Sequence, residues 1–392
     1  MRLRPPVDPE VPETDRTMNQ NLAHLLQQRI RQDVQSMHAY AIQDSTGMVK
    51  LDAMENPHRL PPELQAELGR RLGALAINRY PGSRIADLHA ALAHYVDLPA
   101  GWGLMLGNGS DELIALLAMA CDVPATAGQR PAILAPVPGF VMYAMSAQLQ
   151  GLDFVGVPLT PDFELDESAM LAALHGSRPA IVYLAYPNNP TANLWNADVM
   201  ARLIAAAAEV GSMVVIDEAY QPFSCRSYLD VMRAQPDAHA HVLLMRTLSK
   251  FGLAGVRLGY MLGQQALVAE IDKLRPPYNV SVLNAETALF ALEHQDIFAA
   301  QAKDIQAQRA MLLEALAQLP GVTPYPSQAN MILVRVPDAA RVFAGLKARG
   351  VLVKNVAGLH PLLLNCLRIT VGTSEENTQL MVALTAALKD CP

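Results

Sequence analysis

The chain has 392 residues, of which 51% are hydrophobic and 17% charged, and this composition excludes a disordered protein. The net charge of −7, with no basic tract to offset it, argues against a nucleic-acid partner. Four widely spaced cysteines without a CxxC pair indicate free thiols and a cytoplasmic protein, and the apolar stretches are too short or too interrupted for a membrane span.

The order of the apolar segments predicts a large α/β domain after an N-terminal extension. Residues 1–20 are typical of a flexible arm, and the apolar spacing over 21–37 predicts a helix. From about residue 60 to 290, short apolar runs alternate with amphipathic helices, which favours a parallel sheet with helices on both faces. The expected strands include 132–135, 181–185, 213–216 and 242–245, and 197–209 is an expected helix.

A second, smaller α+β domain is expected after residue 284, where the pattern changes. One long helix is predicted over 285–319, followed by strands at 331–336 and 367–370 and helices at 339–349 and 375–389. The expected organisation is an arm (1–20), an N-terminal helix and segment that pack with the small domain (21–55), a large domain (56–284) and a small domain (285–392).

Lys250 follows the predicted strand 242–245 and precedes a glycine-rich turn, and no other lysine occurs between Lys50 and Lys273. A lysine at the end of a buried strand loses hydration, which lowers the pKa of its amine and makes it nucleophilic. A Schiff-base lysine needs this property. The alternative is a surface lysine in a loop.

The loop GNGSDE, residues 107–112, is a candidate phosphate site. Its glycines, among them Gly109, let the backbone approach a ligand, and Ser110 or Asp111 can cap the following helix, whose N-terminus suits a phosphate. Ser249 and Arg257 flank Lys250, and the arginine fork is also suited to phosphate. An ordinary loop with a good N-cap is the alternative, since the segment is neither a P-loop nor a GxGxxG fingerprint.

Polar groups are also expected at the carboxyl ends of strands, the edge where ligands bind in open parallel sheets. Asn189 lies between two prolines after strand 181–185, and Asp217 and Tyr220 follow strand 213–216. Asp217 could pair with a metal or a protonated ring nitrogen, although the Walker A partner of a metal site is missing. A rigid turn at Asn189, a helix cap at Asp217 and simple packing of Tyr220 are the alternatives.

Taken together, these groups provide a phosphate cradle, a carboxylate, a lysine and two arginines. The second arginine, Arg368, begins a predicted strand and could clamp a substrate carboxylate or form a surface salt bridge. A cofactor with a phosphate, a protonated ring nitrogen, a phenolic oxygen and an aldehyde fits this set. Pyridoxal 5′-phosphate is such a cofactor, and no metal is needed.

The order of motifs resembles that of fold-type I pyridoxal-phosphate aminotransferases, most narrowly the histidinol-phosphate aminotransferase branch, over about residues 40–388. The matching motifs are LDAMENP (51–57), YPGS (80–83), GNGSDE (107–112), YPNNPT (186–191), IDEAY (216–220), TLSKFGLAGVRLGY (247–260) and LRITVGTSEEN (367–377). The resemblance implies an α/β large domain with a mostly parallel seven-stranded sheet flanked by helices, a smaller α+β domain, and a homodimer with shared active sites. It also implies transamination of L-histidinol phosphate with 2-oxoglutarate in histidine biosynthesis.

The resemblance assigns roles by position. Lys250 would form the internal aldimine and move a proton between Cα and C4′, and Asp217 would keep the ring nitrogen protonated. Asn189 and Tyr220 would hydrogen-bond the ring oxygen, and Phe140 would stack on the ring. The cofactor phosphate would be held by Gly109, Ser110, Ser249 and Arg257. Asp111 would flank this phosphate site, and Tyr80 would reach it from the neighbouring subunit. The expected substrate contacts are Tyr40, Tyr80, Asn189, Lys354 and Arg368.

Departures from the family pattern leave other activities open. Lys354 stands where many relatives carry arginine, so it keeps the charge but loses the bidentate fork. An aminotransferase acting on aromatic amino acids and a decarboxylase of a phosphorylated amino acid are therefore alternatives. Arg257 follows Lys250 one residue sooner than in many aminotransferases, which implies a tighter turn or a different register. A non-catalytic binding module of the same fold is disfavoured because Lys250 and Asp217 are both present.

Overall fold

The computed structural model describes residues 20–36, 43–125 and 127–390, and the chain has two units, Met1–Asp44 and Ser45–Pro392. In the first unit the described residues form two helices, α1 (Gln20–Arg29) and α2 (Gln32–Gln35), where the sequence predicted one over 21–37. The chain leaves the helical conformation at Arg31, whose ψ is 137°. The packing of residues 21–55 with the small domain stays a prediction. Residues 1–19 of the expected arm, and Tyr40, lie outside the described residues.

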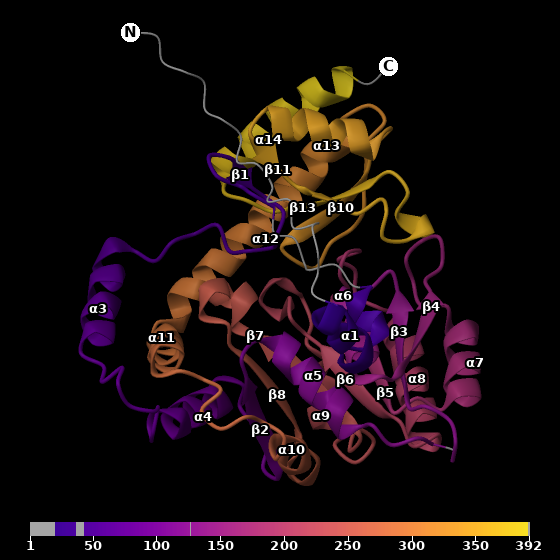
Figure 1. Cartoon of the computed structure of the whole chain (residues 1–392). Helices are drawn as coiled ribbons and strands as arrows, with labels where there is room; N and C mark the ends of the chain where they lie inside the picture. Colours follow the sequence, from indigo (N-terminus) through magenta and orange to yellow (C-terminus); the bar gives the residue numbers. More distant parts are fainter. Residues whose placement is uncertain (1–19, 37–42, 126, 391–392) are drawn as a thin grey trace. The chain divides into compact units, whose positions relative to one another are not determined.

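A seven-stranded sheet in the order β2-β8-β7-β6-β5-β3-β4 forms the centre of the second unit (Figure 1). Its strands are β2 (Trp102–Gly107), β3 (Ala132–Val137), β4 (Asp153–Pro158), β5 (Ile181–Ala185), β6 (Met213–Asp217), β7 (Val242–Thr247) and β8 (Gly259–Gln264). Strand β8 runs antiparallel to both neighbours, and the other pairs are parallel. The expected mostly parallel seven-stranded α/β sheet is confirmed, although the sequence runs had indicated only β3, β5, β6 and β7.

Two hydrophobic layers cover the two faces of this sheet, because successive side chains of a strand point to opposite faces. In β5, Val182 and Leu184 belong to one core, and Ile181 and Tyr183 belong to the other. The first core includes α4 (Arg84–Tyr95), α7 (Glu167–Ser177), α8 (Ala197–Glu209), α9 (Tyr228–Ala234) and α11 (Val282–Glu293). The second includes α5 (Ser110–Ala120), α6 (Val141–Gln150) and α10 (Gln265–Asp272), while α3 (Pro62–Gly73) packs on α11.

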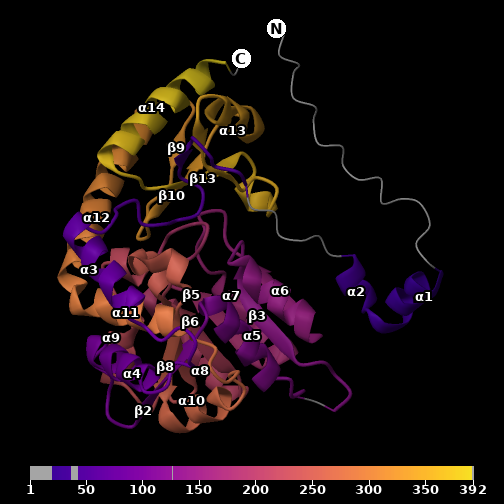
Figure 2. The same ribbon diagram turned by 60° about the vertical axis from the view of Figure 1, so that its left-hand side comes forward.

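A smaller antiparallel sheet in the order β12-β13-β10-β9 forms the second lobe (Figure 2). Its strands are β9 (Thr323–Pro324), β10 (Met331–Arg335), β12 (Lys354–Asn355) and β13 (Cys366–Thr370), and β1 (Val49–Lys50) pairs separately with β11 (Val351–Leu352). The helices α12 (Gln295–Ala317), α13 (Ala339–Ala348) and α14 (Ser374–Lys389) share a core with these strands. No helix within the described ranges combines the length and the apolar character of a membrane span.

The single helix predicted over 285–319 is wrong. The chain forms α11 and α12 instead, separated at His294, whose φ and ψ are −113° and 31°. Helix α11 buries Ala285 and Ala288 in a core of the large sheet, whereas α12 buries Ile305 and Leu312 in the core of the small lobe. The break lets two consecutive segments turn their apolar sides towards different cores, a requirement that helical spacing alone does not reveal.

The carboxyl ends of β2, β5, β6 and β7 meet at one edge of the large sheet, because β2 and β7 both run antiparallel to the β8 strand between them. Gly109 follows β2, Asn189 follows β5, Asp217 ends β6, and Lys250 follows β7. The sheet topology therefore gathers residues from distant parts of the chain at the edge where open α/β sheets bind ligands.

Candidate active site

A cavity of about 340 Å³ lies at this edge. Its walls include the predicted residues Ser110, Asp111, Phe140, Asn189, Asp217, Tyr220, Ser249, Lys250 and Arg257, and Gly109 directly precedes Ser110. Residues to which the sequence assigned no role line it as well, namely Ala53, Met54, Glu55, Tyr143 and Thr247. A cavity of this volume with a few convergent polar groups suits a small organic molecule.

Lys250 lies in the short helical turn η2 (Ser249–Leu253), just beyond β7. Its Nζ donates a hydrogen bond to the Ala53 carbonyl (3.2 Å) and lies 5.9 Å from the centroid of the Tyr220 ring. Burial, followed by the positive charge of Arg368, lowers the pKa of Lys250 to about 8. The cavity thus contains an amine that loses its proton far more readily than an exposed lysine does.

Asp217 is a buried carboxylate at the end of β6. It accepts hydrogen bonds from the Tyr143 hydroxyl (2.7 Å) and from the backbone N–H of Ala219 (3.0 Å). Burial raises the pKa of Asp217 to about 6, a rise that these two hydrogen bonds oppose. The group therefore stays mostly anionic at neutral pH and can pair with a protonated ring nitrogen. Tyr143, which stacks on Tyr183 with 4.2 Å between ring centroids, was missed because its sequence context resembles ordinary core packing.

An anion cradle lies between the start of α5 and the turn after Lys250. Arg257 donates hydrogen bonds to Asp111 Oδ2 (3.2 Å) and to Ser249 Oγ (3.4 Å). Gly109 has a φ of 83°, and a Cβ atom there would lie 2.7 Å from Arg257 Nη2, so glycine is required for this close approach. Arg257 itself has a left-handed φ of 55°.

Asn189 joins Tyr220 to Arg368. The amide nitrogen of Asn189 donates to the Tyr220 hydroxyl (3.1 Å), and its amide oxygen accepts from Arg368 Nη1 (2.8 Å). Arg368 Nη2 donates to the carbonyl of Asp52 (2.7 Å). Burial raises the pKa of Tyr220 well above its usual range, so the phenol is neutral and can donate a hydrogen bond.

Lys354, Arg368 and Tyr80 are not among the residues that line this cavity, although Arg368 contacts the lining residue Asn189. Lys354 lies directly opposite Arg368 on the neighbouring strand, so the two side chains point to the same face of the small sheet. Tyr80 is 75% exposed, and its ring stacks on Tyr278 with 4.2 Å between centroids. Within one chain, therefore, Tyr80 is directed to the surface and not into the cavity.

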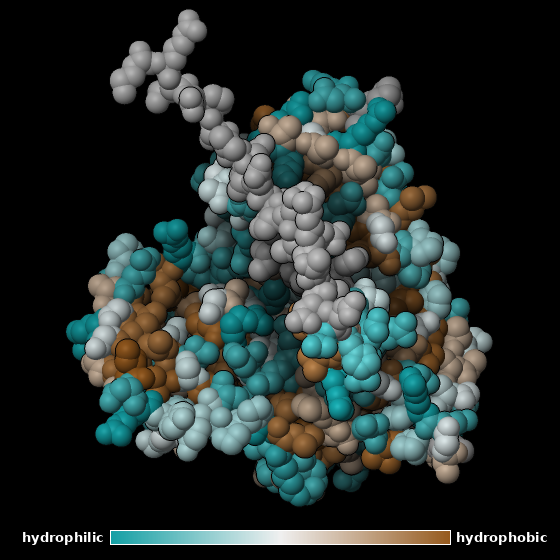
Figure 3. All heavy atoms as spheres, in the orientation of Figure 1, coloured by the Kyte–Doolittle hydropathy of each residue, from teal (hydrophilic) through white to brown (hydrophobic). Residues whose placement is uncertain are grey.

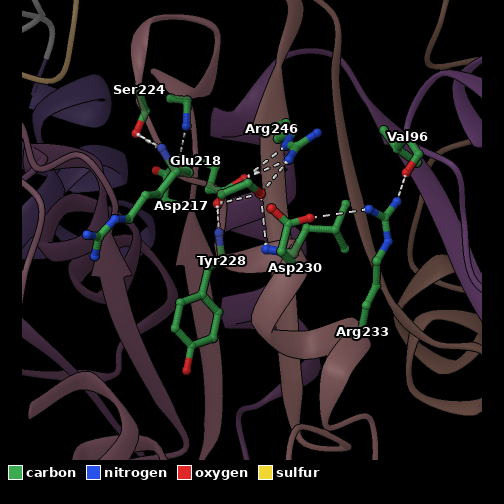
Figure 4. Close-up of polar contacts among 12 residues, drawn as sticks. Val96, Asp217, Glu218, Ser224, Tyr228, Asp230, Arg233 and Arg246 are labelled. Atoms are coloured by element: carbon green, nitrogen blue, oxygen red, sulfur yellow. Dashed lines mark hydrogen bonds and ion pairs between the residues drawn. The ribbon is translucent and has the colours of Figure 1, made fainter. Parts of the chain in front are cut away.

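A buried ion pair beside the cavity joins the ends of β6 and β7 (Figure 4). Arg246 donates to Glu218 Oε2 from Nε (3.0 Å) and from Nη2 (2.8 Å). Glu218 also accepts from the Ser227 hydroxyl and from the backbone N–H of Tyr228. The side chain of Glu218 is 0% exposed and that of Arg246 is 10% exposed. Because Glu218 directly follows Asp217, the pair holds the strand end that presents Asp217, a role that the sequence pattern did not indicate.

This constellation of lysine, strand-end carboxylate and anion cradle on a mostly parallel sheet is accompanied by clear sequence similarity. Residues 46–384 match the profile of the family aminotransferase class I and II, and the chain belongs to this family. It is therefore an aminotransferase.

Individual members of the family are similar to this chain over nearly its whole length. The chain is 69% identical over 367 residues to a histidinol-phosphate aminotransferase of Methylibium petroleiphilum, covering 94% of this chain and 96% of that protein. It is 68% identical over 363 residues to the histidinol-phosphate aminotransferase of Polaromonas naphthalenivorans, covering 93% and 97%. Its fold matches the crystal structure of histidinol-phosphate aminotransferase from Sinorhizobium meliloti in complex with pyridoxal-5′-phosphate, with a TM-score of 0.80, 24% identity, and coverage of 93% and 98%.

Pyridoxal 5′-phosphate is the cofactor of this family, and the donors around the cavity fit it. Arg257, Ser249 and the N-terminus of α5 suit the phosphate, while the buried Asp217 suits a protonated ring nitrogen. Lys250 is the one amine among the described residues that line the cavity, and its lowered pKa suits reaction with an aldehyde.

Proposed function

We propose that this protein transfers the amino group of L-histidinol phosphate to 2-oxoglutarate, giving imidazole acetol phosphate and glutamate in histidine biosynthesis. The observation that carries the proposal is the buried Lys250 amine, which lies beside Tyr220 and near the positive charge of Arg368. The names of the two bacterial relatives at 68% and 69% identity support the choice of substrate.

Each polar group of the cavity has a task in this reaction. When bound, pyridoxal 5′-phosphate supplies an aldehyde that carries the amine and a ring that accepts electrons. Lys250 Nζ would take the proton from Cα of the amino substrate and deliver it to C4′, the aldehyde carbon that the cofactor supplies, and in the reverse direction it would return the proton to Cα. Asp217 would hold a proton at the ring nitrogen, and Asn189 and Tyr220 would bind the ring oxygen. Ser110, Ser249 and Arg257 would hold the phosphate next to the backbone of Gly109, and Phe140 would cover the ring.

Arg368 was expected to bind the carboxylate of an acid substrate and Lys354 to lie near the substrate phosphate; we propose that the two together clamp the substrate anion. They lie opposite each other on β13 and β12, and the guanidinium of Arg368 already reaches Asn189 at the edge of the cavity. A phosphate between the two cations would gain charge-assisted hydrogen bonds from both. Glutamate, the second amino substrate, would use Arg368 for its α-carboxylate.

The substrate proposal is tested with purified protein and separate half-reactions. We expect kcat/KM for L-histidinol phosphate to exceed the values for phenylalanine and tyrosine by at least roughly 100-fold, since a polar clamp rejects substrates that leave it unpaired. The cofactor absorbance reports each half-reaction. A normal response to phenylalanine with none to histidinol phosphate would favour the aromatic alternative, and release of carbon dioxide would identify a decarboxylase.

We further propose that the protein is a cytoplasmic homodimer in which Tyr80 reaches the cofactor phosphate of the neighbouring subunit. Ile77 and Tyr80 are 72% and 75% exposed, and Tyr278 is 58% exposed. Figure 3 shows hydrophobic residues gathered on the surface around α3 and α11. A surface of this kind favours association. The expected result in sedimentation is a mass of about twice 42.4 kDa, and a monomer at micromolar concentration would contradict the shared site.

A further inference from the structure

Glu55 is a cavity carboxylate without a task in holding the cofactor. The described lining of the cavity contains three carboxylates, Glu55, Asp111 and Asp217. Asp111 pairs with Arg257 in the anion cradle, and Asp217 lies at the end of β6. The Glu55 carboxylate is 45% exposed and forms an ion pair with Lys50. Glu55 thus lines the cavity while nearly half of its side chain remains accessible to solvent.

The backbone that carries Glu55 is held by groups from the small lobe. The Met54 N–H donates to Thr370 Oγ1 (3.0 Å), and the Met54 carbonyl accepts from Asn330 Nδ2 (2.9 Å). Met54 has a φ of 52°, a left-handed conformation that costs free energy in a residue other than glycine. Strain of this kind persists where the surroundings impose it, and such positions cluster at functional sites. The surroundings thus fix the backbone from which the Glu55 side chain starts.

Glu55 also lies close to the reacting centre. Lys250 Nζ donates to the carbonyl of Ala53, two residues before Glu55, and Arg368 donates to the carbonyl of Asp52. Burial and Arg368 lower the pKa of Lys250, and the negative charge of Glu55 opposes them. The segment 52–55 therefore runs between the amine that moves the proton and the arginine that binds the substrate anion.

The chemistry of L-histidinol phosphate requires an acceptor in this region. Two arms extend from the carbon that loses its proton, one ending in a phosphate and the other in an imidazole. Arg368 and Lys354 attract the phosphate arm. The imidazole N–H must then find an acceptor, because a donor removed from water without a partner weakens binding. Asp111 pairs with Arg257, and Asp217 accepts from Tyr143 and Ala219. Glu55 pairs with Lys50 through Oε2, which leaves its second oxygen to accept this hydrogen bond.

We propose that Glu55, oriented by Lys50, is a specificity-determining residue that accepts a hydrogen bond from the imidazole ring of the amino substrate. The proposal rests on the proposed function. Phenylalanine has no ring donor for this carboxylate, and the side chain of glutamate carries a negative charge of its own. Glu55 should consequently favour the histidinol phosphate half-reaction over the glutamate half-reaction, which the same active site must also perform.

The test compares the two half-reactions of the holoenzyme in the variant Glu55→Gln. We expect kcat/KM for histidinol phosphate to fall roughly five- to tenfold, because the amide oxygen of glutamine still accepts a hydrogen bond but lacks the charge that strengthens it. The glutamate half-reaction should change less than about threefold, and it also shows that the variant is folded and loaded with cofactor. Glu55→Asp, which keeps the charge, should recover part of the loss.

The control is Glu167→Gln, which removes a carboxylate that is ion-paired to Arg202 between α7 and α8. Both half-reactions should be unchanged in this control. An equal loss in both half-reactions of Glu55→Gln, or no loss in either, would overturn the assignment of Glu55. Failure of the unaltered enzyme to react with histidinol phosphate would instead contradict the proposed function, so the two outcomes are distinguishable.

Discussion

Replacing Lys250 with alanine is expected to lower the rate of transamination by roughly 10⁴-fold or more. Under the proposed function, the variant would lose both the amine that attaches the cofactor and the base that removes the substrate proton. Lys250 is the one amine among the described residues lining the cavity, so none of these residues can take its place. Single-turnover measurement of the cofactor absorbance with L-histidinol phosphate checks this result.

The matched control is Lys273→Ala. This lysine has a side chain that is 65% exposed and pairs with Glu270 at the surface. The Lys273→Ala variant should retain full activity. Borohydride reduction of the unaltered enzyme should leave the cofactor attached to the peptide that contains Lys250. Recovery of the reduced cofactor on a different lysine would refute the assigned chemistry.

Breaking the buried ion pair between Glu218 and Arg246 is expected to cost the fold about 3–5 kcal/mol of unfolding free energy. In Arg246→Met the fully buried Glu218 carboxylate keeps its charge but loses its cation. The end of β6 should then relax, so that activity falls together with stability because Asp217 is adjacent. Urea unfolding followed by circular dichroism, with cofactor present at a fixed concentration, measures the difference.

Two further variants separate the charge from the packing. Arg202→Met removes an exposed arginine from its pair with Glu167, and we expect little change in stability. The double variant Arg246→Met with Glu218→Leu removes both buried charges and should recover much of the lost free energy. A single variant Arg246→Met as stable as the unaltered protein would show that the buried pair does not hold β6 and β7 together.

The parts of the site that could be predicted from sequence are those attached to strand ends. Asn189, Asp217 and Lys250 each lie within a few residues of a buried apolar run, and parallel strands bring their carboxyl ends to one edge. Short-range patterns of this kind can be recognised in the amino-acid sequence alone. The antiparallel strand β8 and the exposed strand β4 could not be predicted from such patterns. Neither has the long apolar run of a central strand or a regular alternation of apolar and polar residues.

Residues whose position depends on distant contacts could not be predicted. Tyr143 reaches Asp217 only because α6 packs on one face of the large sheet, and Glu218 is buried only because Arg246 comes beside it on the next strand. Glu55 enters the cavity because Thr370 and Asn330 hold Met54 from the far end of the chain. In each case the local sequence allows several environments, and tertiary packing selects one.

The contacts of Asn189 demand a side chain that is both a donor and an acceptor. The Asn189 amide nitrogen donates to the Tyr220 hydroxyl, and its amide oxygen accepts from Arg368. A carboxylate at this position would offer only acceptors, and a protonated amine only donors. The chain of hydrogen bonds thus has a fixed direction, from guanidinium through amide to phenol. The Tyr220 oxygen accepts the hydrogen bond from Asn189, so the hydrogen of the Tyr220 hydroxyl is not used in this series of hydrogen bonds. The Tyr220 hydroxyl can donate that hydrogen to an oxygen inside the cavity. The hydrogen bond from Asn189 therefore determines that Tyr220 acts as a donor towards a bound ligand.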